Sequence, residues 1–590
     1  MAARAFARVA PLRAKVAFYA VVLVAAYLAW RLISVQIVQG PKLAREAMSQ
    51  RSETVELLAK RGAILDREGN VLVRSLPSES VYAVPTNIVD PHATALQLSG
   101  LLAFKPEAIE AALREHSQFR WLARKISHES AQKVRALNIV GIGTKTEDTG
   151  VRFNPSGRLA ASVLGFTGLD EDGLAGIEYA FNSYLHGTAG EMRIEADQFG
   201  RAIPFGDTTV ITHAKPGRNL ALTLDSYLQF ETQRALAAQV QAYHARSGTA
   251  IIMDPQSGEI LAMANSPDYE PAHFAKYSAD TRRDRAIEDA YEPGSTFKLI
   301  TAAAAIENHA FSPTARFPAR DALEIGGHVI HNAEDGLMAG NSGSESIEDI
   351  IAYSHNVGAA EIGLAVGPRQ MYRTIRAFGF GDSTQVELSG ENPGIVPEVK
   401  DWSGSSLATI SFGHGISTTP LALVRAYAAI ANGGLLMRPR VVRALYDEKG
   451  NVLYHYPAEI ERRVISASTA ATLRQYLRAV VLRGTGKPAA QVPGYTTAGK
   501  TGTAQVVENG RYEPGEYIAS FIGYVPAEHP KFVILVKVER PRGSIYGSVV
   551  AAPVFVELAR AAMLHAGDMP AAVPTRVRLV GRPTASNVHP

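Results

Sequence analysis

A serine and a lysine lie three residues apart, as Ser295 and Lys298, directly after a Pro-Gly pair in the stretch YEPGSTFKLI. Pro293-Gly294 ends one segment, so Ser295 should stand at or near a helix start, where free backbone N–H groups favour negative charge. Small apolar residues after Lys298 predict a buried helix, and burial lowers a lysine pKa. A neutral lysine here can take the serine proton, which would make Ser295 a nucleophile.

The same spacing occurs a second time, at Ser130 and Lys133, in a charged stretch without a Pro-Gly break. We interpret that copy as an exposed helix face. The Ser-x-x-Lys spacing alone therefore does not identify a nucleophile, because a surface serine that caps a helix, followed by an exposed lysine, shows the same pattern.

Two more elements follow downstream, Ser354-His355-Asn356 and the Lys-Thr-Gly sequence that begins at Lys500. Ser-x-x-Lys, Ser-x-Asn and Lys-Thr-Gly together mark serine β-lactamases and penicillin-binding proteins. Ser354 can relay a proton between Lys298 or Lys500 and a leaving amine, and Asn356 can hold the substrate backbone amide. Lys500 adds positive charge that suits a substrate carboxylate and lowers the pKa of Lys298 further.

The residues after Lys500 complete a candidate site. Gly502 leaves the predicted strand without a side chain where a substrate approaches. The backbone N–H of Thr503, together with that of Ser295, is placed to form an oxyanion hole. Three motifs in this order make coincidence a poor explanation.

These motifs need a domain whose sheet joins distant segments. Two strands are predicted after residue 248, at Thr249 to Met253 and Glu259 to Ala264, and a hairpin at Ile518 to Val525 and Lys531 to Val538. A strand at Leu220 to Leu224 and a helix come before them. Strands at both ends with helices between them predict an α+β domain.

Beyond the three motifs, the chain resembles the class B penicillin-binding proteins over residues 55 to 560. The blocks that carry the resemblance are RGAILDREGNVL, GRLAASVLGFTGLDEDGLAGIEYAFNSYLHGTAG, TAIIMDPQSGEILAMANSPDYEP, FGHGISTTPLALVRAYAAIANGG and RGTGKPA. The resemblance implies a penicillin-binding/β-lactamase-like transpeptidase domain, with an antiparallel sheet flanked by helices. It also implies an elongated pedestal domain before that domain.

The resemblance implies a peptidoglycan D,D-transpeptidase without cofactor or metal. Ser295 would attack the penultimate D-Ala carbonyl of a stem peptide, and the acyl-enzyme would pass to an amine on a neighbouring stem. Thr501 and Thr503 would bind the terminal carboxylate, and β-lactams would acylate the same serine. Glu292 before Pro-Gly is typical of the division-specific FtsI type. The partners that the resemblance implies are a SEDS-type membrane glycosyltransferase and other division proteins.

Two features depart from the pattern or suggest other chemistry. His355 stands where many relatives have Ser or Asp, and we expect it at the rim of the pocket. His328 and His331 in GGHVIHN could suggest a metal pair, but without a clear third ligand we predict an ordinary hairpin strand.

The N-terminal region predicts a membrane anchor. Val16 to Trp30 is free of charge and apolar and continues as far as Val38, with basic residues before it. We expect a single-pass protein of the bacterial cytoplasmic membrane, with its N-terminus inside and its catalytic domain outside; a cleaved signal peptide is the alternative. Five basic and no acidic residues lie in the first 31; the remaining 55 basic and 57 acidic side chains give −2, which does not indicate a nucleic-acid partner.

The predicted organisation has five parts. They are a cytoplasmic segment (1–15), a transmembrane anchor (16–38), a pedestal or dimerisation-type domain (40–215), a transpeptidase domain (216–565) and a flexible tail (566–590). The chain has no cysteine, which rules out disulfides and a cysteine nucleophile.

Four alternatives stay open from the sequence. An elongation-type transpeptidase would share the three motifs, although that branch more often has proline where Glu292 stands. A β-lactamase would need fast deacylation, and no E-x-x-L-N segment lies between Asn356 and Lys500. A membrane-anchored β-lactam receptor usually has several membrane spans. A structural pseudoenzyme would not need intact Ser295 and Lys298.

Overall fold

The computed structural model describes residues 2–43, 46, 52–57, 59–195, 208–332, 343–487, 489–508 and 510–570. Most of the predicted tail, residues 571–590, therefore lies outside the described residues, as does Met1 of the predicted cytoplasmic segment. The chain divides into two compact units, residues 1–59 with 187–216, and residues 60–186 with 217–590.

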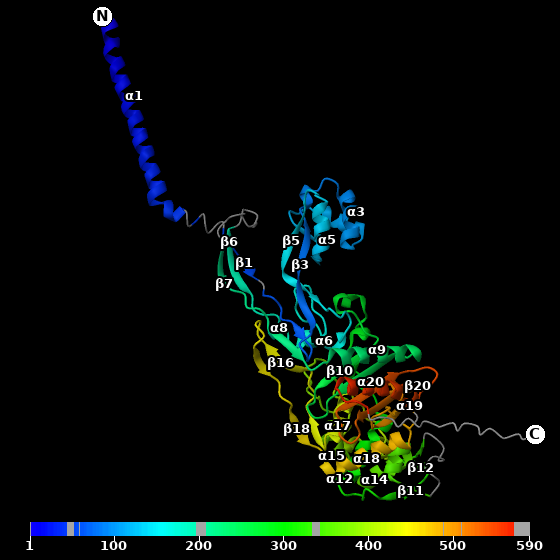
Figure 1. The fold of residues 1–590 in the computed structure, drawn as a ribbon. Helices are drawn as coiled ribbons and strands as arrows, with labels where there is room; N and C mark the ends of the chain where they lie inside the picture. Colours follow the sequence, from blue (N-terminus) through cyan, green and yellow to red (C-terminus); the bar gives the residue numbers. More distant parts are fainter. Residues whose placement is uncertain are drawn as a thin grey trace, which may run out of the picture. The chain divides into compact units, whose positions relative to one another are not determined.

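The first unit contains an N-terminal helix and a small sheet (Figure 1). Helix α1 (Ala2–Ile33) continues into the π-helical turn η1 (Ser34–Val38). The stretch Leu12–Val38 is long and apolar enough to cross a membrane, which fits the predicted anchor; a signal sequence meets the same criteria. Strands β1 (Ser52–Leu57), β6 (Gly190–Glu195) and β7 (Thr208–Thr212) form an antiparallel sheet in the order β1-β6-β7.

The second unit begins with a seven-stranded sheet that segments from distant parts of the chain share. Its order is β17-β16-β8-β2-β3-β4, with β5 also paired to β3. Helices α3, α4 and α5 cover β3 and β4 around a core that includes Val81, Leu98 and Ile109. The bounds are β2 (Ile64–Leu65), β3 (Val71–Ala83), η2 (Pro85–Asn87), α3 (Pro91–Leu102), α4 (Pro106–Leu113), β4 (Arg120–Ile126), α5 (His128–Ala136), β5 (Ile142–Phe153), β8 (Asn219–Leu222), β16 (Val442–Tyr446) and β17 (Val452–His455).

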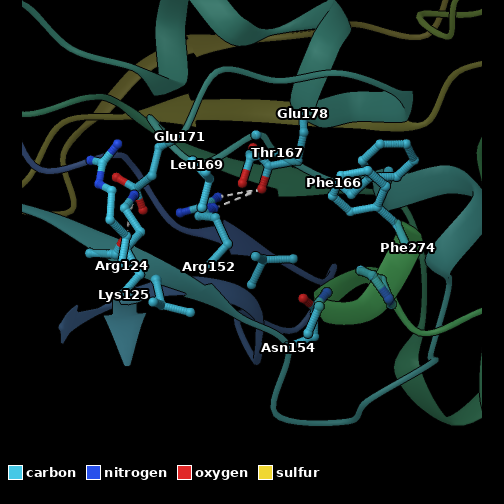
Figure 2. A pocket seen from close by; sticks show the side chains of 17 residues that line it. Arg124, Lys125, Arg152, Asn154, Phe166, Thr167, Leu169, Glu171, Glu178 and Phe274 are labelled. Carbon is cyan, nitrogen blue, oxygen red and sulfur yellow. Dashed lines mark hydrogen bonds and ion pairs between the residues drawn. The ribbon is translucent and has the colours of Figure 1, made fainter. Parts of the chain in front are cut away.

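A buried ion-pair cluster links two of the sequence blocks quoted above. Arg61 donates from Nε and Nη2 to Glu178 Oε2 at 2.8 and 2.6 Å, and Arg152 Nε donates to Glu178 Oε1 at 2.8 Å. Figure 2 shows the Arg152–Glu178 contact at the wall of a cavity of about 370 Å³, with Phe166 and Phe274 on another side. A buried arginine needs such a partner, so Arg61 in RGAIL and Glu178 in GIEYA require each other.

The second sheet is the one that carries the candidate site. Its strand order is β10-β9-β21-β20-β19, with every neighbouring pair antiparallel. Strands from both ends of the domain meet in its centre, where Ile251 faces Leu535. This confirms the predicted α+β arrangement. The bounds are β9 (Ser247–Met253), β10 (Ile260–Ser266), β19 (Ala498–Glu508), β20 (Arg511–Val525) and β21 (Phe532–Glu539).

Helices cover both faces of this sheet, and alternating side chains divide between two cores (Figure 1). Ile252 packs towards α9 (Ser226–Ala242) and α20 (Ala552–His565), whereas Ile251 packs towards α17 (Pro420–Ala431) and α12 (Lys298–Glu307). A strand that is buried on both faces explains the nearly continuous apolar sequence TAIIM.

The remaining helices and strands complete the second unit. They are α6 (Ala161–Leu164), α7 (Gly176–Ala180), α8 (Asn182–Leu185), η3 (Pro271–Lys276), α10 (Ala279–Arg282), α11 (Arg285–Glu288), η4 (Gly294–Phe297), β11 (Arg316–Pro318), β12 (Ala322–Ile325), β13 (His328–His331), β14 (Ser344–Ser346), α13 (Ile347–Tyr353), α14 (Asn356–Val366), α15 (Pro368–Ala377), η5 (Val399–Asp401), α16 (Ser406–Ile410), β15 (Leu435–Met437), β18 (Ile460–Arg463), α18 (Ala467–Leu482) and α19 (Gly547–Val550).

Candidate active site

Ser295 lies on the 3-10 turn η4, which runs directly into α12. This confirms the prediction that the serine stands at a helix start. The turn is held on two sides: Gly294 N donates to Gly413 O at 3.2 Å, and the hydroxyl of Tyr427 donates to Thr296 O at 2.7 Å. Ser295 itself is only half-buried, so its hydroxyl stands on a fixed turn within reach of solvent.

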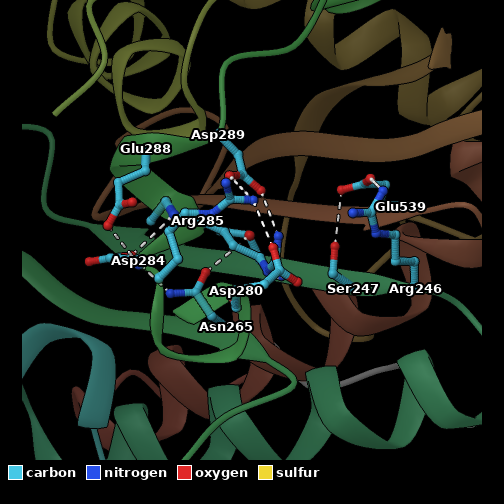
Figure 3. Close-up of polar contacts among 12 residues, drawn as sticks. Arg246, Ser247, Asn265, Asp280, Asp284, Arg285, Glu288, Asp289 and Glu539 are labelled. Atoms are coloured by element: carbon cyan, nitrogen blue, oxygen red, sulfur yellow. Dashed lines mark hydrogen bonds and ion pairs between the residues drawn. The ribbon is translucent and has the colours of Figure 1, made fainter. Parts of the chain in front are cut away.

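The segment that leads into this turn is anchored by a polar network (Figure 3). Asn265 Nδ2 donates to Asp284 Oδ1 at 2.8 Å, and Arg285 pairs with Asp280 at 2.7 Å and with Asp289 at 3.0 Å. Burial raises the pKa of Asp284 to about 6. Four residues before Ser295, the ring of Tyr291 lies beneath the ammonium of Lys537, whose Nζ is 4.9 Å from the ring centroid.

The second motif occupies the connection between α13 and α14. Ser354 adopts the left-handed conformation (φ +62°), and Asn356 is the first residue of α14. The side-chain oxygen of Asn332 accepts from Asn356 N at 2.8 Å and from Val357 N at 3.1 Å, so Asn332 caps this helix. Sequence reasoning missed Asn332, because it lies in a different segment from the helix that it caps.

Lys298 connects the first motif to the second. Its Nζ donates to Ser354 O at 2.5 Å, to Ser354 Oγ at 3.2 Å and to Asn356 Oδ1 at 2.7 Å. The side chain is 1% exposed. Burial, and next the positive charge of Lys500, lower the pKa of Lys298 well below its usual value, while Glu345 opposes this. The predicted burial of α12 is confirmed from Lys298 to Ile306.

Lys500 reaches the same serine from the other side. Its Nζ donates to Ser354 Oγ at 2.9 Å and to Thr501 O at 3.1 Å, and burial lowers its pKa to about 7. Ser354 therefore stands between two buried amines, which is the geometry a proton relay requires. The hydroxyl of Thr501 lies 2.8 Å from that of Thr485, which sequence reasoning had not singled out although it lies in the quoted RGTGKPA block.

The predicted residues Gly502 and Thr503 lie on β19 beside the nucleophile turn. A Cβ on residue 502 would lie 2.4 Å from Ser520 Oγ and 3.0 Å from Thr296 Cγ2. The strand therefore needs a glycine here to pack against η4 and β20, a reason different from the substrate approach that we had inferred. Thr503 follows at once and faces Ala519 across the ladder.

The prediction that His355 lies at the pocket rim is wrong. Its side chain is 8% exposed and contacts the carboxylate of Glu345, which is 1% exposed. The reason is that His355 stands at the N-cap position of α14, where Asn332 provides the cap, while its neighbours on both sides face Lys298, so its own ring points inward. Glu345 could not be found from the sequence, since it belongs to none of the three motifs.

The histidines of GGHVIHN are exposed on strand β13. His328 and His331 are three residues apart, so their side chains point to opposite faces of that strand. The described residues hold no cluster of three or more His, Asp or Glu side chains suited to a metal ion. The hairpin contributes to the site through its backbone instead, because Asn356 Nδ2 donates to His331 O at 2.9 Å.

Glu292, three residues before Ser295, contacts both the segment that follows His414 and the β19–β20 hairpin. Glu292 Oε1 accepts from Gly415 N at 2.8 Å, and the Tyr512 hydroxyl donates to Glu292 Oε2 at 3.1 Å. Burial, and then Lys298, lower the pKa of the neighbouring His414 to about 4. A cavity of about 690 Å³ lies beside these residues and is lined partly by Tyr291, Glu292 and Gly415.

Together these groups can carry out serine acyl transfer. A half-buried serine stands on a helix start, and a buried lysine three residues later has a lowered pKa. A second serine connects that lysine to another buried amine. The side-chain amide of Asn356 has two N–H groups. Among the described residues, one of them donates to His331 O, which leaves the other for a substrate.

Two domain-family models match this chain. The penicillin binding protein transpeptidase domain matches residues 248–560, and the penicillin-binding protein dimerisation domain matches residues 56–222. The first match covers the whole second sheet and all three motifs.

Proteins of known name resemble the chain over most of its length. Stage V sporulation protein D of Bacillus subtilis is 34% identical over 92% of this chain and 83% of its own length. Peptidoglycan D,D-transpeptidase FtsI of Escherichia coli is 31% identical over 91% and 88%. Among solved structures, penicillin binding protein 3 from Mycobacterium tuberculosis, in complex with aztreonam, is similar with a TM-score of 0.67 at 29% identity, over 88% of this chain and 99% of that one.

The motifs, the fold and these relatives agree with one another. A dimerisation domain precedes the transpeptidase domain, as the sequence blocks predicted. The chain belongs to the class B penicillin-binding proteins and is a peptidoglycan D,D-transpeptidase.

Proposed function

We propose that the chain cross-links stem peptides through an acyl-enzyme on Ser295, in septal wall synthesis during division. The observation that carries the chemical part is the pair of contacts that Ser354 makes with Lys298 and Lys500, beside the turn that bears Ser295. Glu292 before Pro-Gly, which resembles the division-specific FtsI type, and the relative named FtsI support the division role.

In the first half-reaction Ser295 Oγ attacks the penultimate D-Ala carbonyl. Lys298, neutral because burial and Lys500 disfavour its charge, takes the serine proton. The backbone N–H groups of Ser295 and Thr503 hold the developing oxyanion. Ser354 passes a proton to the departing amine, so the C–N bond breaks as D-Ala leaves.

In the second half-reaction the amine of a neighbouring stem attacks the ester carbonyl, and the proton path runs in reverse back to Ser295. Asn356 holds the amide of the donor stem, and Thr501 and Thr503 bind the terminal carboxylate before it leaves. Lys500 provides the positive charge that this carboxylate needs.

A β-lactam satisfies the same geometry, because its strained amide takes the place of the D-Ala–D-Ala bond and its leaving nitrogen stays tethered. We therefore expect covalent inhibition at Ser295. Penicillin binding protein 3 from Mycobacterium tuberculosis, solved once in complex with aztreonam and once with ampicillin, is similar to this chain and supports this expectation.

A fluorescent penicillin tests the assignment on the full-length protein in detergent. The wild type and Ser130→Ala should be labelled covalently, and Ser295→Ala should not. Labelling that survives Ser295→Ala contradicts the proposed site. Rapid release of the label would favour a β-lactamase instead.

Depletion in cells tests the septal role. Filamentous cells would support it, and round cells would favour an elongation-type enzyme. The proposed setting is the cytoplasmic membrane, with α1 and η1 as the single anchor and the second unit outside. The proposed partners are a SEDS-type glycosyltransferase and other division proteins.

A further inference from the structure

We propose that Glu345 and His355 form a buried positioning pair that holds Ser354 and Asn356 against Lys298 and supplies a negative charge near Lys298. The three motifs do not specify this pair, because Glu345 belongs to none of them and His355 is the variable residue of the second. The inference rests on the proposed roles of Lys298 and Ser354.

The backbone fixes Glu345 beneath the second motif. Strand β14 pairs with β11, and Glu345 stands opposite Phe317 in the register. The side chain is 1% exposed, so its carboxylate has been removed from water at a cost that only a nearby positive or donor group can offset.

The helix that carries Asn356 makes room for this carboxylate. A Cβ on residue 358 would lie 2.5 Å from Glu345 Oε1, so the first turn of α14 needs Gly358. Among the described residues, no hydrogen-bond donor contacts Oε1, although the carboxylate is buried. The first turn of α14 therefore faces Glu345 with the positive end of the helix dipole.

His355 transmits the position of Glu345 to the motif. Its Nδ1 contacts Glu345 Oε2, its backbone N donates to Ile350 O at 3.1 Å, and its carbonyl accepts from Ala359 N at 3.4 Å. With the ring and both backbone groups held, the residues on either side have little freedom. Those residues are Ser354 and Asn356, which together make all three contacts to Lys298 Nζ.

The charges around the site give Glu345 a second role. Lys298 faces Lys500 from β19, Glu345 from β14 and His414 from the loop before α17, and Glu345 also faces Glu361 on α14. Of these neighbours, Glu345 raises the pKa of Lys298 while Lys500 lowers it. Two buried amines beside one serine are tolerated more easily when an anion interacts with one of them, as Glu345 does with Lys298.

The test measures the rate of acylation by fluorescent penicillin as a function of pH, on full-length protein in detergent, for the wild type and Glu345→Gln. Each rate is divided by the fraction of protein that can be labelled at completion, so that misfolded protein does not count. The rate should rise with pH as Lys298 loses its proton.

Glu345→Gln should slow acylation on the high-pH plateau by roughly 10–100-fold, because the second motif is held less firmly. It should also move the midpoint of the rise to lower pH by about 1 unit, since removing the carboxylate makes the ammonium of Lys298 less stable. An unchanged midpoint would overturn the proposed electrostatic role, and an unchanged plateau the positioning role.

Glu178→Gln is the matched control, because Glu178 is equally buried and paired but lies far along the chain in the Arg61–Arg152 cluster. It should lower the thermal midpoint and leave the pH midpoint of acylation unchanged. If Glu345→Gln behaves in the same way as this control, Glu345 is a structural residue only.

A double-mutant cycle tests the pairing itself. His355→Ser restores a residue that many relatives have, and it should slow acylation by itself. In combination with Glu345→Gln it should add little, because one interaction is removed twice. Fully additive losses would show that the two residues act independently. Failure of the wild type to be labelled at all would instead contradict the proposed function.

Discussion

The chain contains Ser-x-x-Lys twice, and the two copies have different surroundings. On α5, Lys133 is 57% exposed and pairs with Glu129 one turn earlier at 2.6 Å. At η4 and α12, Lys298 is 1% exposed and contacts Ser354 and Asn356. The interpretation of the first copy as an exposed helix face is confirmed.

The Ser-x-x-Lys spacing therefore provides only the geometry of one helical turn. Reactivity requires burial without a carboxylate partner in direct contact, and a neighbouring amine that disfavours the charge. Of the two lysines, only Lys298 has both features. The same substitution made at both copies should therefore slow acylation at Lys298 and leave it unchanged at Lys133.

The largest expected effect comes from Lys298→Arg compared with Lys133→Arg. A guanidinium stays charged and cannot take a proton, so acylation by fluorescent penicillin should fall about 1,000-fold or more at Lys298. The rate of Lys133→Arg should equal that of the wild type. A loss of less than tenfold in Lys298→Arg would show that the base is another group.

The next effect is that of Ser354→Ala, with Ser130→Ala as its control. Removing the hydroxyl between Lys298 and Lys500 interrupts the proposed relay, and acylation should slow by roughly 100–1,000-fold. Thermal midpoints should show that both variants are folded. Wild-type acylation by Ser354→Ala would mean that the two lysines exchange protons by another path.

A buried acid near the nucleophile gives a pH-dependent difference in stability. The pKa of Asp284 is about 6 in the folded protein against 3.8 in a model peptide, so the free energy of unfolding should fall as pH rises between these values. Asp284→Asn removes this dependence, and its stability relative to the wild type should increase by on the order of 3 kcal/mol across that window.

Glu129→Gln, beside the exposed copy, should show no comparable gain, because Glu129 lies in water and its pKa is lowered by Lys133. Urea unfolding at several pH values checks both variants. A difference between Asp284→Asn and wild type that does not change with pH would contradict the burial-raised pKa.

The smallest effects concern backbone support at the two copies. Tyr427→Phe leaves Thr296 O without its buried donor, and Ser127→Ala removes the cap of α5; each should lower the free energy of unfolding by about 1 kcal/mol. Only Tyr427→Phe should also slow acylation, because it loosens the turn of Ser295. Equal acylation rates in the two variants would show that this turn needs no such support.

Much of the fold could be predicted because its signals are local. The strands β9, β10, β20 and β21 follow apolar patterns and turn residues, and their predicted ranges overlap the observed ones; the helix expected before them is α9. The full length of β3 could not be predicted, since its residues SLPSES lack an apolar pattern.

The residues of the three motifs could be singled out because each motif has a recognisable spacing; they include Ser295, Lys298, Ser354, Asn356 and Lys500. Asn332, Glu345 and Thr485 could not, because each acts across a distance in sequence on a residue that has its own motif. The burial of His355 could not be predicted for the same reason, since its partner Glu345 is not recognisable from composition or from the periodicity of apolar residues.

Mapping the acylated residue tests most directly whether Ser295 is the nucleophile. Full-length protein is treated with a penicillin, digested and analysed by mass spectrometry for the added penicilloyl mass. The account predicts the adduct on the peptide that contains Ser295, and an unmodified peptide around Ser130. An adduct on Ser354, on the Ser130 peptide or on any other residue, with Ser295 unmodified, would contradict it.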